Sequence, residues 1–243
     1  SKPIAKRDEY INMHKNYKTR LKNNPFIKKN FIKDEIEFIN NLALITQVTK
    51  KKSKTNYLHG FILMKILKEY IKDKNEKINI LETGTARGFS SLIMSRTLKK
   101  FQKKYKINTI DIIPHNRKIY WNCISDIDNG RVSRKELIKD YNLLSKNINF
   151  LTGNSYKILR NLKMRRINFA FLDGSHEYKD VKCEFDYIDK RNTIGDIIIL
   201  DDYTPGLFDG IVRLTNEIMA EKKYFLKIID EDINRGYVIL VKK

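Results

Sequence analysis

The sequence predicts an α/β fold in which a mostly parallel sheet is covered by helices on both faces and ends in an antiparallel hairpin. Three observations predict it. Short β-branched segments alternate with amphipathic helical segments from about residue 57 onward. Glycine-rich or acid-rich turns directly follow several of the apolar segments. The last two segments, 224–229 and 236–241, are separated by a polar turn too short for a crossover helix, so they must pair antiparallel.

The composition is that of a folded protein. The chain of 243 residues is 41% hydrophobic and 32% charged, which allows a sizeable core and excludes global disorder. No apolar run approaches the roughly 18 to 20 residues of a spanning helix, and no apolar stretch follows the opening residues as in a signal peptide. We therefore expect a cytoplasmic protein with no membrane partner. Cys123 and Cys183 are too few for a disulfide framework, so we expect reduced thiols.

The first 55 residues form a basic segment. They contain 14 Lys or Arg against 5 Asp or Glu, and their apolar residues gather in a few short clusters. We expect a helical extension over residues 1–55 and one further domain over residues 56–243. The net charge of +20 favours a nucleic-acid partner, because Lys and Arg neutralise phosphates. Lysine is abundant throughout the chain, however, so a general compositional bias is the simpler explanation.

The alternation of elements begins with a helix. Apolar residues at 58, 61, 62, 66, 67, 70 and 71 follow the helical period and predict an amphipathic helix over 57–72. A strand over 78–81, a helix over 89–101 and a strand over 107–113 come next. Residues 114–132 then interrupt the pattern with Pro114, Trp121 and Asn129-Gly130, so we expect an insert that forms a loop or lid.

The alternation resumes after the insert. Ser133 and Glu136 have the spacing of a capping box and introduce a predicted helix over 135–145. A final helix carries apolar residues at helical spacing from Phe208 to Met219. Between these two helices we expect strands over 148–151, 167–172 and 196–200 and helices over 156–162 and 177–189.

A glycine turn follows the first strand, with Glu82, Gly84 and Gly88 in the pattern Glu-x-Gly-x-x-x-Gly. Glycine allows the backbone to turn sharply and to approach a ligand closely. Dinucleotide-binding turns read Gly-x-Gly-x-x-Gly and bind a pyrophosphate, but this chain lacks the middle glycine, and Glu82 would repel a phosphate. A cofactor with a cationic or zwitterionic head suits the turn better, and S-adenosylmethionine is such a molecule.

Two later strand ends fit the same cofactor. Asp111 ends the second strand, where a carboxylate accepts the hydroxyl groups of a ribose. Asn154 and Ser155 follow the third strand, where they would contact an adenine edge. Each residue also has a structural explanation: Asp111 as a turn former, Asn154 and Ser155 as helix caps. Their order along consecutive strands favours the functional interpretation.

Acid-rich turns follow two further strands. Asp173 and His176 come after the fourth, and Asp201 and Asp202 come after the fifth. Because adjacent parallel strands end at one edge of a sheet, the three acids should converge, and their repulsion calls for a cation. Oxygen ligands favour Mg²⁺, Ca²⁺ or Mn²⁺. His176 is the candidate general base, since imidazole ionises near neutral pH. The alternative is that Asp173 and Asp202 cap helices and His176 is an ordinary polar residue.

The motifs taken together resemble those of a known family. Glu-Thr-Gly-Thr-x-x-Gly-x-Ser-Ser, Leu-Asp-Gly-Ser-His-x-Tyr-x-x-Val and Gly-Asp-Ile-Ile-Ile-Leu-Asp-Asp-Tyr resemble class I S-adenosylmethionine-dependent methyltransferases, in particular macrocin-type sugar O-methyltransferases. The chain is similar, more distantly, to catechol O-methyltransferase. The resemblance covers residues 57–243 and implies a Rossmann-like sheet of five parallel strands and a terminal antiparallel hairpin.

The resemblance also implies roles for single residues. Asp173 and His176 would be catalytic, and the metal ligands would be Asp173, Asp201 and Asp202, most simply around Mg²⁺. The residues that would contact S-adenosylmethionine are Glu82, Gly84, Thr85, Gly88, Ser90, Asp111, Asn154, Ser155 and Asp173.

The function implied is methyl transfer to a hydroxyl of a small molecule, such as a sugar or a nucleotide-linked sugar, and the acceptor could be anionic. Two alternatives stay open. One is methylation of an RNA 2′-hydroxyl, favoured by the basic charge. The other is a non-catalytic binding protein that keeps the fold. The N-terminal segment could cap the active site, recognise the acceptor or support a homo-oligomer.

Overall fold

The structure, a computed structural model, describes residues 3–52, 54–232 and 235–243. The chain divides into two compact units, each assembled from three stretches. We call them the helical unit (Ser1–Glu69, Ala86–Thr97 and His115–Lys146) and the sheet unit (Tyr70–Thr85, Leu98–Pro114 and Asn147–Lys243). No helix in the described part of the chain is both long and apolar enough to cross a membrane.

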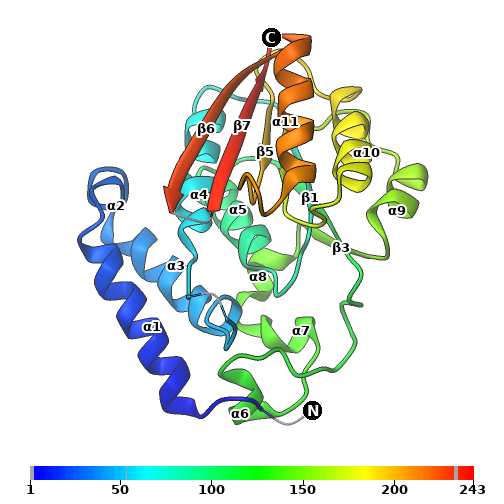
Figure 1. Ribbon diagram of the computed structural model, residues 1–243. Coiled ribbons are helices and arrows are strands. Elements are labelled where there is room, and N and C mark those ends of the chain that lie inside the picture. Colours follow the sequence, from blue (N-terminus) through cyan, green and yellow to red (C-terminus); the bar gives the residue numbers. More distant parts are fainter. Residues whose placement is uncertain (1–2, 53, 233–234) are drawn as a thin grey trace. The chain divides into compact units, whose positions relative to one another are not determined.

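The sheet unit contains one seven-stranded sheet with the order β3-β2-β1-β4-β5-β7-β6 (Figure 1). The first five strands are parallel, whereas β7 runs antiparallel to β5 and β6 antiparallel to β7. This is the predicted Rossmann-like sheet with its terminal hairpin. The strands are β1 (Ile78–Thr83), β2 (Tyr105–Asp111), β3 (Ile148–Thr152), β4 (Phe169–Leu172), β5 (Ile197–Leu200), β6 (Tyr224–Asp232) and β7 (Arg235–Lys242). Residues 233–234 of the predicted polar turn lie outside the described residues.

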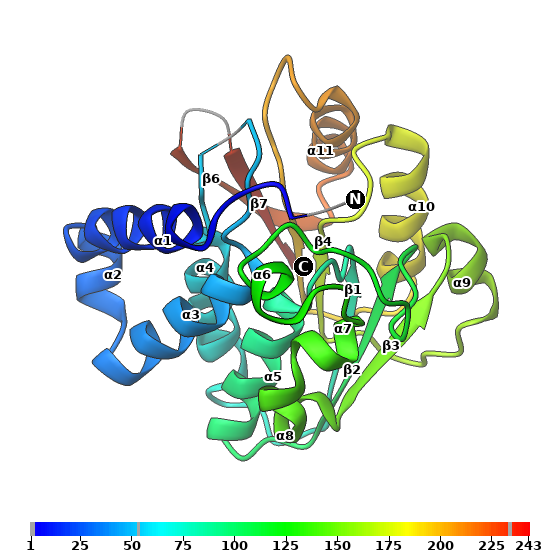
Figure 2. The ribbon, with the colours of Figure 1, turned by 90° about the horizontal axis from the view of Figure 1, so that it is seen from below.

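Three helices of the sheet unit pack beside one another against the strands: α9 (Ser155–Asn161), α10 (Tyr178–Asp189) and α11 (Asp209–Glu221) (Figure 2). Their buried apolar side chains join those of the strands in one core. Val181, Phe185 and Ile188 of α10 repeat at helical spacing and are almost fully buried in it. Burial of such a stripe is the main stabilisation of a helix in a folded protein.

The helical unit contains the N-terminal helices, which the sequence predicts as a helical extension. Tyr57 is fully buried there, and its hydroxyl donates to Asn40 Oδ1 at 2.7 Å. The Tyr17 ring packs on the Tyr57 ring with centroids 4.4 Å apart. The N-terminal and central helices, of which α4 and α5 continue into the sheet unit, are α1 (Arg7–Lys22), α2 (Pro25–Asn30), α3 (Lys33–Thr46), α4 (Leu58–Ile71), α5 (Phe89–Lys100) and α6 (Ser125–Asn129).

The predicted helix over 135–145 is broken into three short pieces: α7 (Arg134–Leu137), the 3₁₀ turn η1 (Lys139–Tyr141) and α8 (Asn142–Ser145). The capping box is confirmed, because the Glu136 N–H donates to Ser133 Oγ at 3.1 Å and the Ser133 N–H donates to Glu136 Oε2 at 2.7 Å. The helix ends one turn later at Ile138, whose ψ of 20° leaves the helical region. Asp140 and Asn142 are weak helix formers and do not continue it.

The backbone segments that follow β1 and β4, at Gly84 and Asp173, pack directly against each other in the sheet unit. Gly84 has φ of +85°, and a Cβ at this position would lie 2.0 Å from the carbonyl oxygen of Asp173. The Asp173 N–H in turn donates to the Thr83 carbonyl at 3.0 Å. Gly84 is therefore required both by its left-handed conformation and by the close approach of the two strand ends.

We predict that Gly84→Ala destabilises the protein by about 3 to 5 kcal/mol, because the added carbon has to displace the backbone at Asp173. Gly195→Ala is the matched control. Gly195 also has a left-handed φ, of +83°, but nothing lies within 4 Å of its added Cβ. The control should cost only the conformational penalty of about 1 to 2 kcal/mol. Urea unfolding of both variants measures the difference, and equal costs would show that the backbone contact is unimportant.

Candidate active site

The carboxyl ends of the parallel strands place the predicted acids along one edge of the sheet unit. The Asp201 N–H donates to the Leu172 carbonyl at 3.0 Å, which continues the pairing of β4 with β5 one residue past the strand. Asp202 follows with φ of +56°, a left-handed conformation that aspartate tolerates better than most residues. The turns after β4 and β5 are therefore held next to each other, as the sequence predicts for parallel neighbours.

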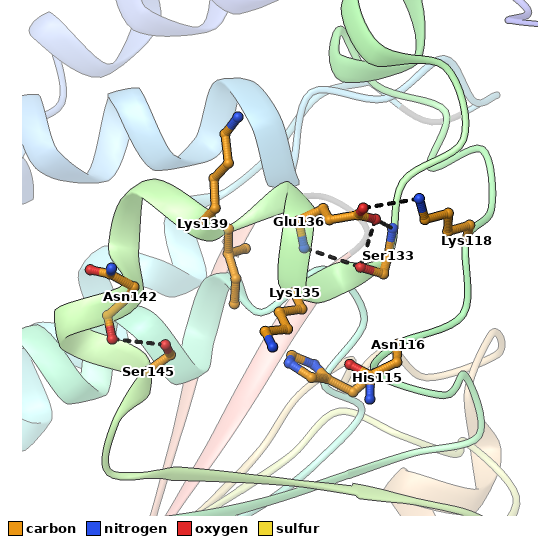
Figure 3. A pocket seen from close by; sticks show the side chains of 10 residues that line it. His115, Asn116, Lys118, Ser133, Lys135, Glu136, Lys139, Asn142 and Ser145 are labelled. Carbon is orange, nitrogen blue, oxygen red and sulfur yellow. Dashed lines mark hydrogen bonds and ion pairs between the residues drawn. The ribbon is translucent and has the colours of Figure 1, made fainter.

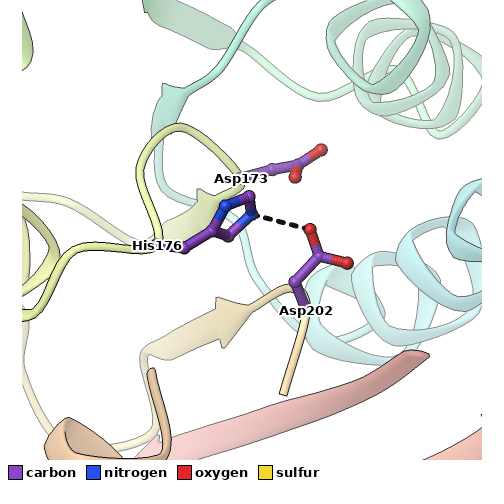
Figure 4. Close-up of side chains that lie close together, drawn as sticks. All are labelled: Asp173, His176 and Asp202. Atoms are coloured by element: carbon purple, nitrogen blue, oxygen red, sulfur yellow. Dashed lines mark hydrogen bonds and ion pairs between the residues drawn. The ribbon is translucent and has the colours of Figure 1, made fainter. Parts of the chain in front are cut away.

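Asp173, His176 and Asp202 form a cluster, which we call the acid–histidine cluster (Figure 4). One possible ligand atom from each of the three residues lies within 4.8 Å of the other two. His176 Nε2 is 2.8 Å from Asp202 Oδ2, and the imidazole stacks on Phe208 with ring centroids 4.1 Å apart. The stacking and the hydrogen bond together fix the orientation of the imidazole ring.

Asp201 lies outside this cluster because it is bound to Arg235. The Arg235 Nε–H donates to Asp201 Oδ1 at 3.0 Å, and Nη2 contacts the second carboxylate oxygen. The Asp201 side chain is fully buried. Arg235 Nε also lies 3.5 Å from Asp202 Oδ1. The positive charge beside Asp201 is thus the Arg235 guanidinium group, where the sequence predicts a metal ion.

Arg235, which is 34 residues from Asp201, is not among the site residues that the sequence predicts. The strand topology could have predicted this partner. Because β7 runs antiparallel to β5, its first residues must lie at the carboxyl end of β5, beside the acidic turn. A basic residue at the start of the last strand is therefore a candidate partner for those acids.

The carboxyl groups of Asp173, Asp201 and Asp202 lie close enough to affect one another's ionisation. Burial, followed by the charge of Asp201, raises the pKa of Asp173 well above its usual value, and Arg235 opposes that rise. Burial and Asp201 likewise raise the pKa of Asp202, while Arg235 and His176 act to lower it. The cluster therefore retains a proton more readily than isolated carboxyls do, and a cation bound there would displace it.

The residues of the predicted cofactor turn fall in both units. In the sheet unit, Glu82 is fully buried at the end of β1, and Thr85 Oγ1 lies 2.6 Å from Thr109 Oγ1. Asp111 ends β2, and its Oδ1 accepts the Ile113 N–H at 2.7 Å. In the helical unit, Gly88 has φ of +90° and Ser90 is buried in the first turn of α5.

The helical unit ties the remainder of the glycine turn to the insert. The Arg87 Nε–H donates to the Trp121 carbonyl at 2.8 Å, and the Arg134 Nε–H donates to the Ala86 carbonyl at 2.6 Å. Both guanidinium groups also lie over the Trp121 ring, at 6.0 and 5.7 Å from its centroid. Two arginines over one indole hold the insert and the turn in a single arrangement.

Asn154 and Ser155 have structural partners in the sheet unit. Asn154 is the N-cap of α9, and its Oδ1 accepts the Tyr156 N–H at 2.9 Å. The Ser155 side chain hydrogen-bonds to the carboxylate of Glu184. These contacts agree with the capping alternative for Asn154 and leave its role toward an adenine a prediction.

Glu184 is a second buried polar residue that is absent from the predicted site. It lies on α10 among Val181, Phe185 and Ile188, is 1% exposed, and accepts a hydrogen bond from Thr83 Oγ1 at 2.9 Å. Burial raises its pKa to about 7, although the bonds from Ser155 and Thr83 favour the ionised form. Its position among the apolar residues of a predicted amphipathic helix could have identified it as a buried acid.

We predict that Glu184 makes stability fall as pH rises. Its pKa is near 4.5 when unfolded and about 7 when folded, so the folded state binds the extra proton between these values. The free energy of unfolding should drop by about 3 kcal/mol from pH 4 to pH 8 through this group. Glu184→Gln should remove that component in urea unfolding across this range. Glu37→Gln, at an exposed position on α3, is the control and should keep it; parallel curves for both variants would contradict the assignment.

Comparison with known proteins gives one family and a set of similar folds. A family profile described as a methyltransferase domain matches residues 81–203. No curated protein matches the sequence. Among solved structures, the O-methyltransferase TomG from Streptomyces achromogenes, in complex with SAM, is 15% identical, with a TM-score of 0.57 over 78% of this chain and 82% of that one. The O-methyltransferase NovP is 17% identical, with a TM-score of 0.58 over 80% and 83% of the two chains.

An O-methyltransferase from Bacillus cereus in complex with SAH is also 17% identical, with a TM-score of 0.55 over 86% of this chain and 89% of that one. At these identities the structures share the fold with this chain. The family profile runs from β1, through the glycine turn and the Asp-Gly-Ser-His turn, to the acidic pair after β5, and covers half of the chain. The chain therefore belongs to the methyltransferase-domain family.

Proposed function

We propose that the protein transfers a methyl group from S-adenosylmethionine to a hydroxyl group of a small molecule. The observation that supports this most is the acid–histidine cluster, which adjoins the ends of β4 and β5 in the sheet of a methyltransferase domain. A hydroxyl acceptor must lose a proton during methyl transfer, so a base fixed at this edge is useful to the reaction.

The sheet unit offers Glu82, Gly84, Thr85 and Asp111 to the cofactor. Glu82 is buried and acidic, which suits the cationic end of S-adenosylmethionine. Asp111 is half-buried at the end of the next strand, where its carboxylate can accept the ribose hydroxyls. Gly88 and Ser90 of the helical unit remain part of the proposed cofactor set, as do Asn154 and Ser155.

The residues at the cluster fit a divalent cation. Asp173 and Asp202 offer carboxylate oxygens close together, which Mg²⁺ and Mn²⁺ prefer. Such a cation, when bound, would lower the pKa of an acceptor hydroxyl. Asp201 is not proposed as a ligand, since Arg235 occupies both of its oxygens.

His176 is the proposed base. The Nε2–H group of its ring donates a hydrogen bond to Asp202 Oδ2. The other ring nitrogen, Nδ1, is then unprotonated and can accept a proton. In this tautomer Asp202 orients the imidazole and stabilises the imidazolium that forms when a proton is taken up. Phe208 covers one face of the ring and limits its rotation.

An RNA acceptor is the second candidate, favoured by the charge of +20. The Asp-Gly-Ser-His turn after β4 differs from the Asn- or Asp-Pro-Pro-aromatic sequence usual for methylation of base amino groups, so the RNA atom in question would be the 2′-hydroxyl. Methylation of an RNA oligonucleotide, together with no activity toward small hydroxylated compounds, would favour this candidate.

We predict that the protein binds S-adenosylmethionine with a stoichiometry of one in isothermal titration calorimetry. Asp111→Asn should weaken binding by about tenfold, because it removes a charged acceptor for the ribose. The amide can still accept the Ile113 N–H, so the local fold should persist. Glu177→Gln, an exposed acid beside His176, is the control and should bind normally. Absence of binding by the unaltered protein would refute the proposed function.

We further predict different effects of His176→Ala and Asp173→Asn. His176→Ala should bind the cofactor normally and lose methyl transfer by about 100-fold or more, since the base is gone. Asp173→Asn should weaken Mn²⁺ binding, measured by electron paramagnetic resonance of free Mn²⁺. Transfer to a panel of hydroxylated sugars and nucleotide sugars is measured as SAH formed. Full activity of His176→Ala excludes it as the base, and unchanged Mn²⁺ binding by Asp173→Asn excludes Asp173 as a ligand.

A further inference from the structure

The helical unit contains a cavity of about 550 Å³, and nine of its ten lining residues are polar or charged (Figure 3). Its volume is within the range of about 300 to 1,000 Å³ typical of small-molecule sites. The insert supplies one wall, and α7, η1 and α8 supply the other. The lining residues are His115, Asn116, Lys118, Ser133, Lys135, Glu136, Ile138, Lys139, Asn142 and Ser145.

The charges around this cavity are unbalanced. Glu136 is the one acid in the lining; it accepts the Ser133 N–H and lies 3.1 Å from the Lys118 ammonium group. Lys135 and Lys139 form no ion pair with any residue that the structure describes. The lining therefore carries three ammonium groups against one carboxylate, and that carboxylate is already engaged.

His115, in the part of the cavity lining that the insert supplies, lies in a positive electrostatic potential. Burial, followed by the positive charges of Arg134 and Lys135, lowers its pKa to about 4. In Figure 3 the Lys135 ammonium group lies beside the His115 ring. A neutral imidazole next to the Lys135 ammonium group is suited to an anionic ligand, toward which it can donate or accept a hydrogen bond.

The cavity adjoins the glycine turn inside the helical unit. Ile138 lines the cavity, and its Cδ1 is the nearest neighbour, at 3.7 Å, of a Cβ built at Gly88. Arg134, the residue before Lys135, holds the Ala86 carbonyl at 2.6 Å. A ligand in the cavity is thus separated from the turn by a single side chain.

We propose that this cavity binds the phosphate group of a phosphorylated small molecule, with Lys135 as its main charged contact. Lysine binds phosphate as a point charge, and the side-chain amides of Asn116 and Asn142 offer N–H donors to phosphate oxygens. Taken together with the proposed function, on which this step rests, the ligand is the methyl acceptor, such as a sugar phosphate or a nucleotide-linked sugar.

The test follows His115 by NMR during titration with inorganic phosphate, glucose 1-phosphate and unphosphorylated glucose. The chain has four histidines, so its imidazole signals are few, and His115→Gln identifies the relevant one. Both phosphates should raise the pKa of His115, because an anion beside it offsets the cations, and glucose should not. Lys135→Gln should weaken phosphate binding by about fivefold, and Lys135→Arg should restore it. Lys28→Gln, an exposed lysine on α2 outside the cavity, is the matched control and should bind normally.

Each other outcome overturns the proposal. No response of His115 to either phosphate excludes the site. Equal weakening by Lys28→Gln and Lys135→Gln shows diffuse attraction to a basic surface. Competition of phosphate with S-adenosylmethionine shows that the cavity belongs to the cofactor, and binding of an RNA oligonucleotide without glucose 1-phosphate assigns it to RNA. Calorimetry with S-adenosylmethionine keeps the two proposals apart: failure there refutes the methyltransferase activity, whereas phosphate binding is read independently.

Discussion

The arrangement of the acidic edge depends on one buried ion pair. Asp201 is completely enclosed, and a buried carboxylate without a partner would be strongly destabilising. Arg235 provides that partner from the first residue of β7 and also approaches Asp202. The antiparallel strand is what delivers the guanidinium to the carboxyl ends of the parallel strands, so the hairpin that completes the sheet also stabilises the site. Asp202 is left to face His176.

Much of the fold follows from the sequence because it is encoded locally. The short apolar runs of the strands, the helical period of α4 and α10 and the glycine turn each depend on residues that are near neighbours in the chain. The same locality predicts which acids lie at the ends of β4 and β5. The hydrophobic pattern does not predict the interruption at Ile138, since the apolar residues of 135–145 keep a helical spacing although Asp140 and Asn142 are weak helix formers.

The parts of the site that were missed depend on partners far apart in the chain. Arg235 contacts Asp201 from the neighbouring strand β7, and Glu184 contacts Thr83 from a helix 101 residues later. Neither pairing has a spacing that a motif could capture. Repulsion between the three converging acids predicted a metal ion. The Arg235 guanidinium instead binds Asp201, which leaves Asp173 and Asp202 next to His176. In the proposed metal site, the carboxylates left for a cation are therefore those of Asp173 and Asp202.

The two units alternate along the chain, which passes between them five times. The helical unit draws its three stretches from both sides of β1 and β2, and its insert is held by Arg87 from the middle stretch. Neither unit is a contiguous piece of the gene product, so a simple truncation cannot isolate one of them. Each unit also needs contacts between distant parts of the chain, whose closure is entropically costly. During synthesis, neither unit can be completed until most of the polypeptide has left the ribosome.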